Sequence, residues 1–331
     1  MMNRLALALA VTAALGCGGK PEAGGGGSKG KSGGSSSDPA DSPAPGMGSG
    51  MEGSAALRLP STSAGRAQRF QDAWRLWSEG KFDKYGEYYA IDATSSTPGG
   101  PEAPVQGRAP IVAQAVAARK AIPDQTGAIQ VVLASEQVVI SISLGTGVFG
   151  GHPTGAYVGV VTHFGDDDLI ASEAAYMDFD TLQGQARGAT TVRPAVAEVT
   201  GRQVVVAKND ELEKTNQEVI KKLFHAAGDH DVQVLGSLLA DNLVWSDATQ
   251  PKDLDKAGAL ASLQGSWRGP LPRLTPGTRW AAGDYVAVEE TLEAAKPGGL
   301  TVPALAIYRL ANGQIAQAWV FYEHGAAGDA K

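Results

Sequence analysis

The chain has 331 residues, of which 43% are hydrophobic and 19% charged, and this is enough for ordinary hydrophobic cores in about two domains. Its one Cys excludes an internal disulfide and a thiolate zinc site. The formal net charge of −7 at pH 7 provides no basic field to attract phosphate backbones, so we expect no nucleic-acid partner.

Residues 1–17 have the pattern of an export signal. Arg4 precedes an apolar run over residues 5–15, which is shorter than the about 20 residues that span a bilayer. The run ends in Gly16 and Cys17, which resembles a bacterial lipoprotein signal and implies that Cys17 is lipidated and becomes the N-terminus. The alternative is an ordinary secretory signal with an incidental Cys. Gly18 stands where an inner-membrane retention Asp would, so the resemblance implies the outer membrane of a bacterial cell envelope.

Residues 18–64 are rich in Gly, Ser and Pro, with four consecutive glycines at residues 24–27. Such a segment has little apolar surface to bury, and ordering it would cost conformational entropy without return. We therefore expect a disordered tether between the membrane anchor and the folded part.

The remainder opens twice with one pattern, in residues 65–188 and 215–326, and residues 189–214 link the two halves. Each half begins with a helix, a polar turn and a second short helix, and Thr215 with Glu218 predicts a capping box in the second half. The apolar positions that match at helical spacing are Phe70, Ala73, Trp74 and Trp77 in the first half and Ile220, Leu223, Phe224 and Ala227 in the second.

The two halves also close alike. Residues 161–170 align without a gap with residues 306–315, each as a strand, a polar turn and a strand. Continued in that register, alternating residues of the last strand are expected to share one face and to end in a carboxylate. These residues are Ile170, Ser172, Ala174, Tyr176 and Asp178, matched to Ile315, Gln317, Trp319, Phe321 and Glu323.

An earlier strand alternates in each half as well, over residues 138–144 and 286–292. Glu290 lies on the same predicted face as Val286 and Val288, which places a carboxyl group on a buried surface if that face is covered. Helices followed by antiparallel strands predict an α+β class, in which the helices cover one face of a strongly curved sheet. Each half is therefore expected to be a cone with an apolar cavity.

The first half resembles the SnoaL-like branch of the nuclear transport factor 2-like superfamily, the branch that includes polyketide cyclases. The resemblance rests on the Pro-Thr-Gly turn within residues 150–155 and on the tail from Glu173 through Asp178 to Gly188. The second half resembles the superfamily in outline, through the hairpin of residues 310–315. Subunits of this superfamily pair, so the resemblance implies that the two halves form an intramolecular pseudo-dimer.

In that family the Asp of the tail is the general acid/base of an intramolecular aldol closure, and a neighbouring His helps to hold the substrate. The resemblance therefore implies Asp178 and His163 as catalytic residues. An Asp inside an apolar cone would have a raised pKa and could take a proton from a carbon next to a carbonyl without a cofactor. The alternative is that Asp178 caps the segment after the last strand and that His163 faces solvent.

The remaining candidates are ligand contacts. We predict that a small apolar or aromatic ligand is held by Tyr176, Trp74, Glu290, Trp319 and Glu323, with Asp247 as a further polar group of the second cavity. The five His residues have no metal-site spacing, and we expect neither a metal nor a cofactor. We expect the acidic run at residues 166–168 to be an exposed turn.

Three functions remain open. The first is a lipid-anchored protein that binds a small ligand. The second is a cofactor-free cyclase or isomerase that uses Asp178 for proton transfer. The third is a structural envelope protein with vestigial pockets. Because polyketide intermediates are made in the cytoplasm and this chain has an export signal, ligand binding is favoured over the family reaction.

Overall fold

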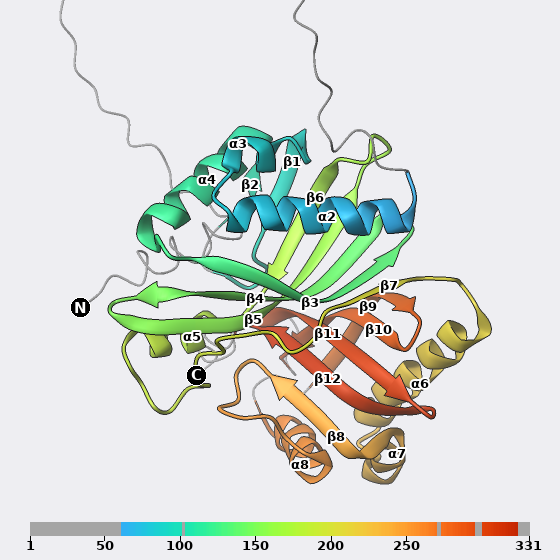
Figure 1. The fold of residues 1–331 in the computed structure, drawn as a ribbon. Helices are drawn as coiled ribbons and strands as arrows, with labels where there is room; N and C mark the ends of the chain where they lie inside the picture. Colours follow the sequence, from blue (N-terminus) through green and yellow to red (C-terminus); the bar gives the residue numbers. More distant parts are fainter. Residues whose placement is uncertain (1–60, 101–102, 270–272, 295–299, 324–331) are drawn as a thin grey trace, which may run out of the picture.

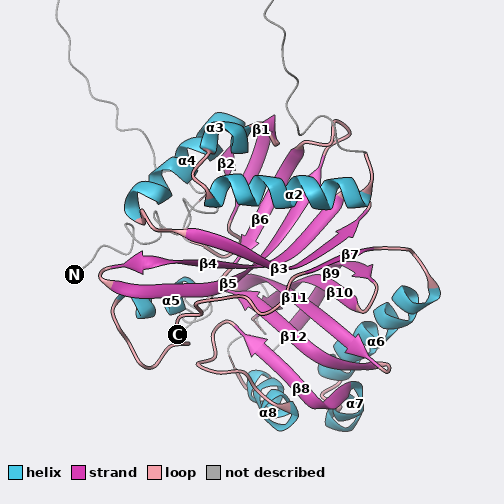
Figure 2. Cartoon of the chain, viewed as in Figure 1, coloured by secondary structure: helices cyan, strands magenta, loops and turns pink. Residues whose placement is uncertain are grey.

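The computed structural model describes residues 61–100, 103–269, 273–294 and 300–323. These residues form two curved sheets that face each other, with most of the helices on the outer sides (Figure 1). Helices and strands alternate in blocks in both halves, which confirms the predicted α+β class (Figure 2). The predicted signal with Cys17, and the tether as far as residue 60, lie outside the described residues.

The first sheet has the strand order β2-β1-β6-β5-β4-β3-β7. Helices α2, α3 and α4 lie over its outer side (Figure 1). The elements of this half are α2 (Ser63–Ser78), α3 (Phe82–Gly86), β1 (Tyr89–Ser96), β2 (Val105–Gln106), α4 (Arg108–Ala121), β3 (Thr126–Ser135), β4 (Val138–Phe149), β5 (His152–Phe164), β6 (Ile170–Tyr176) and α5 (Phe179–Ala186), and β7 (Gln203–Val206) adds an edge strand from the predicted linker.

The second sheet has the order β8-β12-β11-β10-β9. Its elements are α6 (Glu211–Gly228), α7 (Val232–Leu238), β8 (Leu239–Asp247), α8 (Lys256–Ser266), β9 (Arg273–Ala282), β10 (Tyr285–Glu293), β11 (Thr301–Ala311) and β12 (Gln314–Tyr322). With β8 matched to β1 and β9–β12 matched to β3–β6, both sheets have one strand order, which confirms the repeat. The sheets are not wholly antiparallel as predicted, because β1 runs parallel to β6, β8 to β12 and β7 to β3.

The first helix of each half begins at a polar cap. The Thr62 side chain accepts a hydrogen bond from the Gly65 N–H at 3.1 Å, and the Asp210 side chain accepts one from the Glu213 N–H at 3.1 Å. The capping box predicted at Thr215 is therefore wrong. Asp210 begins the helix earlier, and the Thr215 hydroxyl donates to a backbone carbonyl inside it.

A β-bulge interrupts the last hairpin at the same place in both halves. In the first half Phe164 lies opposite Ile170, but His163 lies opposite Ser172, so one residue of β6 is extra. In the second half the shift falls between the Leu310–Ile315 and Arg309–Gln317 pairs. An extra residue reverses the facing of every later side chain. Ile170 therefore faces the helices, whereas Ala174 and Tyr176 face the other sheet.

The alignment without a gap is also wrong by one residue on β5. Five residues separate Phe164 from Ile170, but four separate Leu310 from Ile315, so the first hairpin is one residue longer. His163 therefore corresponds to Arg309, and Thr162 corresponds to Tyr308. The offset does not extend to β6, where Tyr176 and Phe321 keep the predicted match.

A third core fills the space between the two sheets. It contains Ile140, Val161 and Tyr176 from the first half and Ile307, Trp319 and Phe321 from the second, among others. A hydrogen bond also connects the two halves at this junction: the Tyr176 hydroxyl donates to a Glu289 carboxylate oxygen at 2.8 Å. Central strands that are covered on both faces carry apolar residues on both faces. The sequence therefore matched two alternating runs that do not share a face: the run in residues 138–144 faces the other sheet, whereas the run in residues 286–292 faces the helices.

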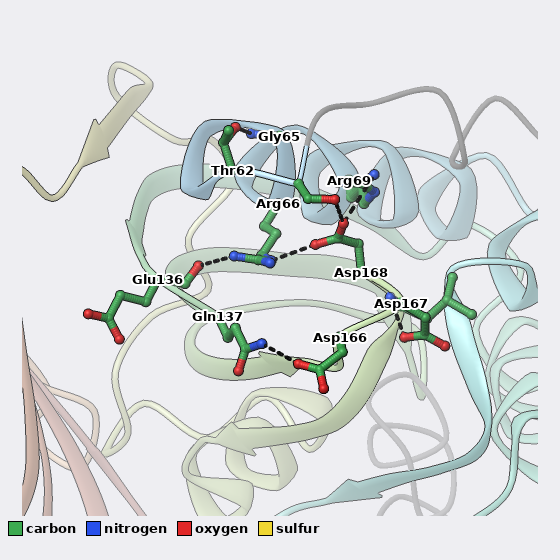
Figure 3. Close-up of polar contacts among 11 residues, drawn as sticks. Thr62, Gly65, Arg66, Arg69, Glu136, Gln137, Asp166, Asp167 and Asp168 are labelled. Carbon is green, nitrogen blue, oxygen red and sulfur yellow. Dashed lines mark hydrogen bonds and ion pairs between the residues drawn. The ribbon is translucent and has the colours of Figure 1, made fainter.

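The acidic turn at residues 166–168 connects the sheet to the start of α2 through ion pairs. Asp168 is buried and ion-paired to Arg66 at 2.8 Å, with Arg69 at 3.9 Å (Figure 3). Burial alone would raise the pKa of Asp168, but the hydrogen bond from Ser61 and the two guanidinium groups together lower it. The expectation of an exposed turn therefore holds for Asp166 and Asp167 but is wrong for Asp168, which holds the end of the tether against the fold.

Candidate functional site

The second half contains a cavity of about 540 Å³, within the size range of small-molecule sites. It lies between the helices and the concave face of the second sheet. Its walls are apolar and aromatic, and a few ionisable groups interrupt them. The residues that line it are Leu223, Phe224, Ala227, Gly228, His230, Trp245, Asp247, Ala259, Ser262, Leu263, Ser266, Trp267, Arg273, Leu274, Glu290, Leu292, Tyr308, Val320 and Tyr322.

The corresponding space in the first half is filled. Two small voids, of about 10 Å³ and about 40 Å³, lie among its described residues there. Trp74 and Trp77 line both voids, with ring centroids 5.3 Å apart. Gly127 on β3 makes room for them, since a Cβ there would lie 2.6 Å from the Trp74 ring nitrogen. A void of about 10 Å³ is close to the space of one water molecule.

One matched position contributes to this difference. Gly80 and His230 both have left-handed backbones, with φ of 73° and 57°, and each follows its first helix at the same distance. This fixes the match of Trp77 with Ala227, as the sequence predicted. The methyl group of Ala227 lines the large cavity, where the first half has an indole. The ring that is missing from α6 therefore contributes to the hollow.

Glu290 is the unusual polar group of the cavity. It lies on β10 opposite Ala304 and Pro276, its side chain is buried, and its Oε2 has no hydrogen-bond partner among the residues that the structure describes. Burial raises the pKa of Glu290 to about 8. The carboxyl group is therefore mostly protonated at neutral pH, and it can donate a proton or give it up with little cost.

Asp247, Tyr322 and His230, three other polar groups of the cavity, each contact a protein partner. Asp247 Oδ1 accepts hydrogen bonds from the Thr249 N–H and hydroxyl, both at 2.8 Å, and burial raises the pKa of Asp247. The Tyr322 hydroxyl lies 3.1 Å from the Thr249 hydroxyl. His230 stacks on Trp267 with centroids 4.4 Å apart. Glu290 is thus distinguished by an oxygen that the protein leaves unsatisfied.

The first half also buries a carboxyl group, but that group has a protein partner. The Tyr89 hydroxyl donates to Glu173 Oε2 at 3.2 Å, and the Tyr85 hydroxyl lies 2.6 Å from that of Tyr89. Burial raises the pKa of Glu173 to about 7, and the Tyr89 hydrogen bond moderates the rise. Burial also raises the pKa of both tyrosines. These three hydrogen-bonded side chains line the void of about 10 Å³, which is too small for a ligand.

The family model for the SnoaL-like domain matches residues 67–173 and again residues 220–318. The chain belongs to the SnoaL-like family. Both halves are thus SnoaL-like domains, including the second half, whose sequence motifs are the weaker. A search of curated proteins finds no match to the chain.

Solved structures similar to the chain each cover about one SnoaL-like domain. IdmH of Streptomyces antibioticus is 19% identical and covers 35% of this chain and 96% of its own, with a TM-score of 0.30. A nuclear transport factor 2-like protein of Mesorhizobium loti is 17% identical and covers 35% and 97%, with a TM-score of 0.31. A similar protein of Burkholderia xenovorans is 12% identical and covers 34% and 87%, with a TM-score of 0.31.

The structure places the predicted catalytic residues of the first SnoaL-like domain at the junction of the sheets. The Asp178 carboxylate accepts a hydrogen bond from the Thr181 N–H at 3.2 Å and caps α5. The His163 ring meets the edge of Trp280 of the second domain at 6.1 Å. The β6 bulge explains this placement, because it turns the Tyr176 face away from the helices. The catalytic assignment of Asp178 and His163 stays a prediction.

The predicted ligand contacts divide between the two SnoaL-like interiors and the junction. Trp74 lines the voids of the first domain, and Glu290 lines the cavity of the second. Tyr176 and Trp319 pack between the sheets, where Trp319 also lines a separate cavity of about 270 Å³. Glu323 Oε2 accepts a hydrogen bond from the Phe179 N–H at 3.0 Å, which ties the last strand of the second domain to α5.

Sequence reasoning did not single out Tyr308, Tyr322 or the helix α8 as walls of the second SnoaL-like cavity. The one-residue difference between the hairpins hid Tyr308, which the alignment without a gap matched to His163. Within the described ranges, no three His, Cys, Asp or Glu residues are grouped so that they could hold a metal ion. Among those same residues, no helix is both long and apolar enough to cross a membrane.

Proposed function

We propose that this protein is a membrane-anchored lipoprotein of the bacterial cell envelope that binds a small, largely apolar ligand in its second SnoaL-like domain. The observation that carries the binding proposal is the cavity of about 540 Å³ with the unsatisfied Glu290 on its wall. The anchor is proposed from the signal-like residues 1–17 with Cys17, and the outer membrane from Gly18.

The proposal includes a role for the first domain. Its filled interior and the apolar core that it shares with the second sheet support an intramolecular pseudo-dimer, in which one chain supplies both partners. In this arrangement the first domain stabilises the convex side of the second sheet, and the concave side of that sheet holds the ligand.

Proton-transfer catalysis is the second candidate function, and one observation favours it. A carboxyl group with a pKa of about 8 inside an apolar cavity is suited to exchange a proton near neutral pH. In this form the candidate rests on Glu290, because the Asp178 carboxylate is engaged as the cap of α5. A ligand that leaves the protein chemically unchanged would favour binding over catalysis.

The experiment compares the full chain with Ala227→Trp, which places in the second domain the ring that fills the first. Both proteins are purified natively in one way, and the small molecules that they carry are extracted and measured by mass spectrometry. We expect a compound in the wild type that is absent from Ala227→Trp. His225→Trp adds the same ring at an exposed site of the same helix, and it should keep the compound.

Equal small-molecule content in the wild type and Ala227→Trp would contradict the binding proposal. It would favour the third function, a structural envelope protein with vestigial pockets. Circular dichroism of both variants shows that a loss of compound reflects the filled cavity and not a lost fold.

A further inference from the structure

The unsatisfied oxygen of Glu290 indicates what kind of ligand the second domain takes. Buried polar atoms in proteins nearly always have a hydrogen-bond partner, so a carboxyl oxygen without one among the described residues, facing a cavity, needs a hydrogen-bonding partner from outside the protein. Tyr308 lies near Glu290, and the nearby carboxyl contributes to the raised pKa of that phenol, yet no hydrogen bond joins the two. The ligand is therefore expected to bring a polar, hydrogen-bonding group to this point.

The charges around the cavity favour a cation over an anion. Asp247 on β8 is a second carboxyl group of the same wall, and after burial it is the next largest cause of the raised pKa of the Tyr322 phenol. The one Arg of the lining, Arg273, has a side chain that is 73% exposed, and it lies 3.8 Å from the Glu293 carboxylate. His230, at the start of α7, is exposed and stacked on a ring. The interior thus presents acidic groups, and its basic groups lie at the outside.

The aromatic walls fit the same ligand. Trp245 packs edge to face with Tyr308 at 6.2 Å, and Trp267 and Tyr322 line the cavity as well. Indole and phenol faces attract cations, most strongly where water is excluded. An apolar body with one positive group would meet apolar surface, ring faces and a carboxyl group together.

We infer that the ligand of the second-domain cavity is an amine, an apolar body with one ammonium group that donates its hydrogen bond to Glu290. This inference rests on the proposed function and narrows it to a ligand class. Binding is coupled to a proton. The empty cavity holds Glu290 as the neutral acid, the ammonium ion enters with its charge, and the Glu290 proton leaves to solvent, so a carboxylate–ammonium pair remains.

The test uses three compounds of similar size and different charge: 4-phenylbutylamine, 4-phenyl-1-butanol and 4-phenylbutanoate. Binding to the full chain is measured by calorimetry at pH 6.5. We expect the amine to bind about 10-fold more tightly than the alcohol, and the carboxylate to bind most weakly. Repeating the amine titration in phosphate and ACES, which both buffer at this pH and differ in ionisation enthalpy, should reveal release of about one proton per amine bound.

Two variants connect the preference to one residue. Glu290→Gln keeps the volume but cannot ionise, so the amine should lose its advantage and its proton release, while the alcohol binds within about 2-fold of wild type. Glu289→Gln changes the next residue of β10, which faces the other sheet and bonds Tyr176. It should leave the order of the three compounds unchanged.

Failure of the inference differs from failure of the proposed function. If the alcohol binds as tightly as the amine, and Ala227→Trp abolishes that binding, the cavity is a ligand site but the amine inference is overturned. If none of the three compounds distinguishes wild type from Ala227→Trp, both proposals are overturned.

Discussion

The two SnoaL-like domains share one scaffold and differ in what fills it. The first domain has the more family-like sequence, yet Trp74 and Trp77 close its interior, while the second domain places Phe224 and Ala227 at the same helical positions. Side-chain volumes on a shared scaffold therefore contribute to whether an interior is open or filled. Likeness to a family motif indicates the fold of a domain but not which copy of it remains open.

The two domains also differ in the position and hydrogen bonding of their buried carboxyl groups. Glu173 on β6 has a protein partner, and its counterpart in the second domain is Ala318. Glu290 on β10 has no partner, and its counterpart in the first domain is Ser143, which bonds Ser141. The acids stand on different strands, so each interior has its own polar group. One is satisfied within the protein, and the other is left for a ligand.

Opening the first interior should have the largest effect. Trp77→Ala removes a buried indole from a space that α2 and β3 close tightly, and it should lower the free energy of unfolding by about 4 kcal/mol. Urea denaturation of the full chain measures this. A loss below about 1 kcal/mol would contradict the view that the two rings fill the first domain.

The buried acids should give the next largest effect, in pH dependence. The folded-state pKa of Glu290 is raised from 4.5 to about 8, so its contribution to stability is fully present below about pH 4.5 and is lost as the pH rises through about 8. Between pH 5 and pH 8.5, wild type should therefore lose roughly 3 kcal/mol more than Glu290→Gln.

Glu173→Gln should act in the same direction but less strongly, because the pKa of Glu173 is raised only to about 7. Unfolding free energies at the two pH values measure both variants, with Glu289→Gln as the matched control. If wild type and Glu290→Gln have the same pH dependence, Glu290 is not a buried neutral acid.

The junction of the domains should give the smallest effect. Tyr176→Phe removes the hydroxyl that donates to Glu289 at 2.8 Å but keeps the ring between the sheets. It should cost about 1 kcal/mol of unfolding free energy. Binding in the second cavity should not change, because Tyr176 does not line it. A change in ligand affinity would show that the junction controls the cavity.

Much of the fold follows from the sequence. The repeat, the matching helices and the shared face of Tyr176 and Phe321 all come from apolar periodicity. The bulges do not, because one extra residue in a strand leaves no signal when both faces are buried. For the same reason the sequence placed Asp178 in a cone, whereas the structure places it as the cap of α5.

The site was predictable only in part. Glu290 could be found because a charged residue interrupts an apolar alternation, and Asp247 because it ends a strand among aromatic residues. The cavity itself could not be predicted, because Ala227 is an ordinary helical residue and no residue pattern in the sequence indicates an unfilled space. Its size depends on how α8, β9 and β11 come together, which no local pattern records.

The most direct test of the account is a titration of the full chain with N-phenyl-1-naphthylamine, an uncharged dye that fluoresces in apolar surroundings. Wild type and His225→Trp should bind the dye alike, and Ala227→Trp should bind it at least about 10-fold more weakly, because the added indole occupies the cavity. Equal binding by wild type and Ala227→Trp would contradict the claim that the hollow second domain is the ligand site.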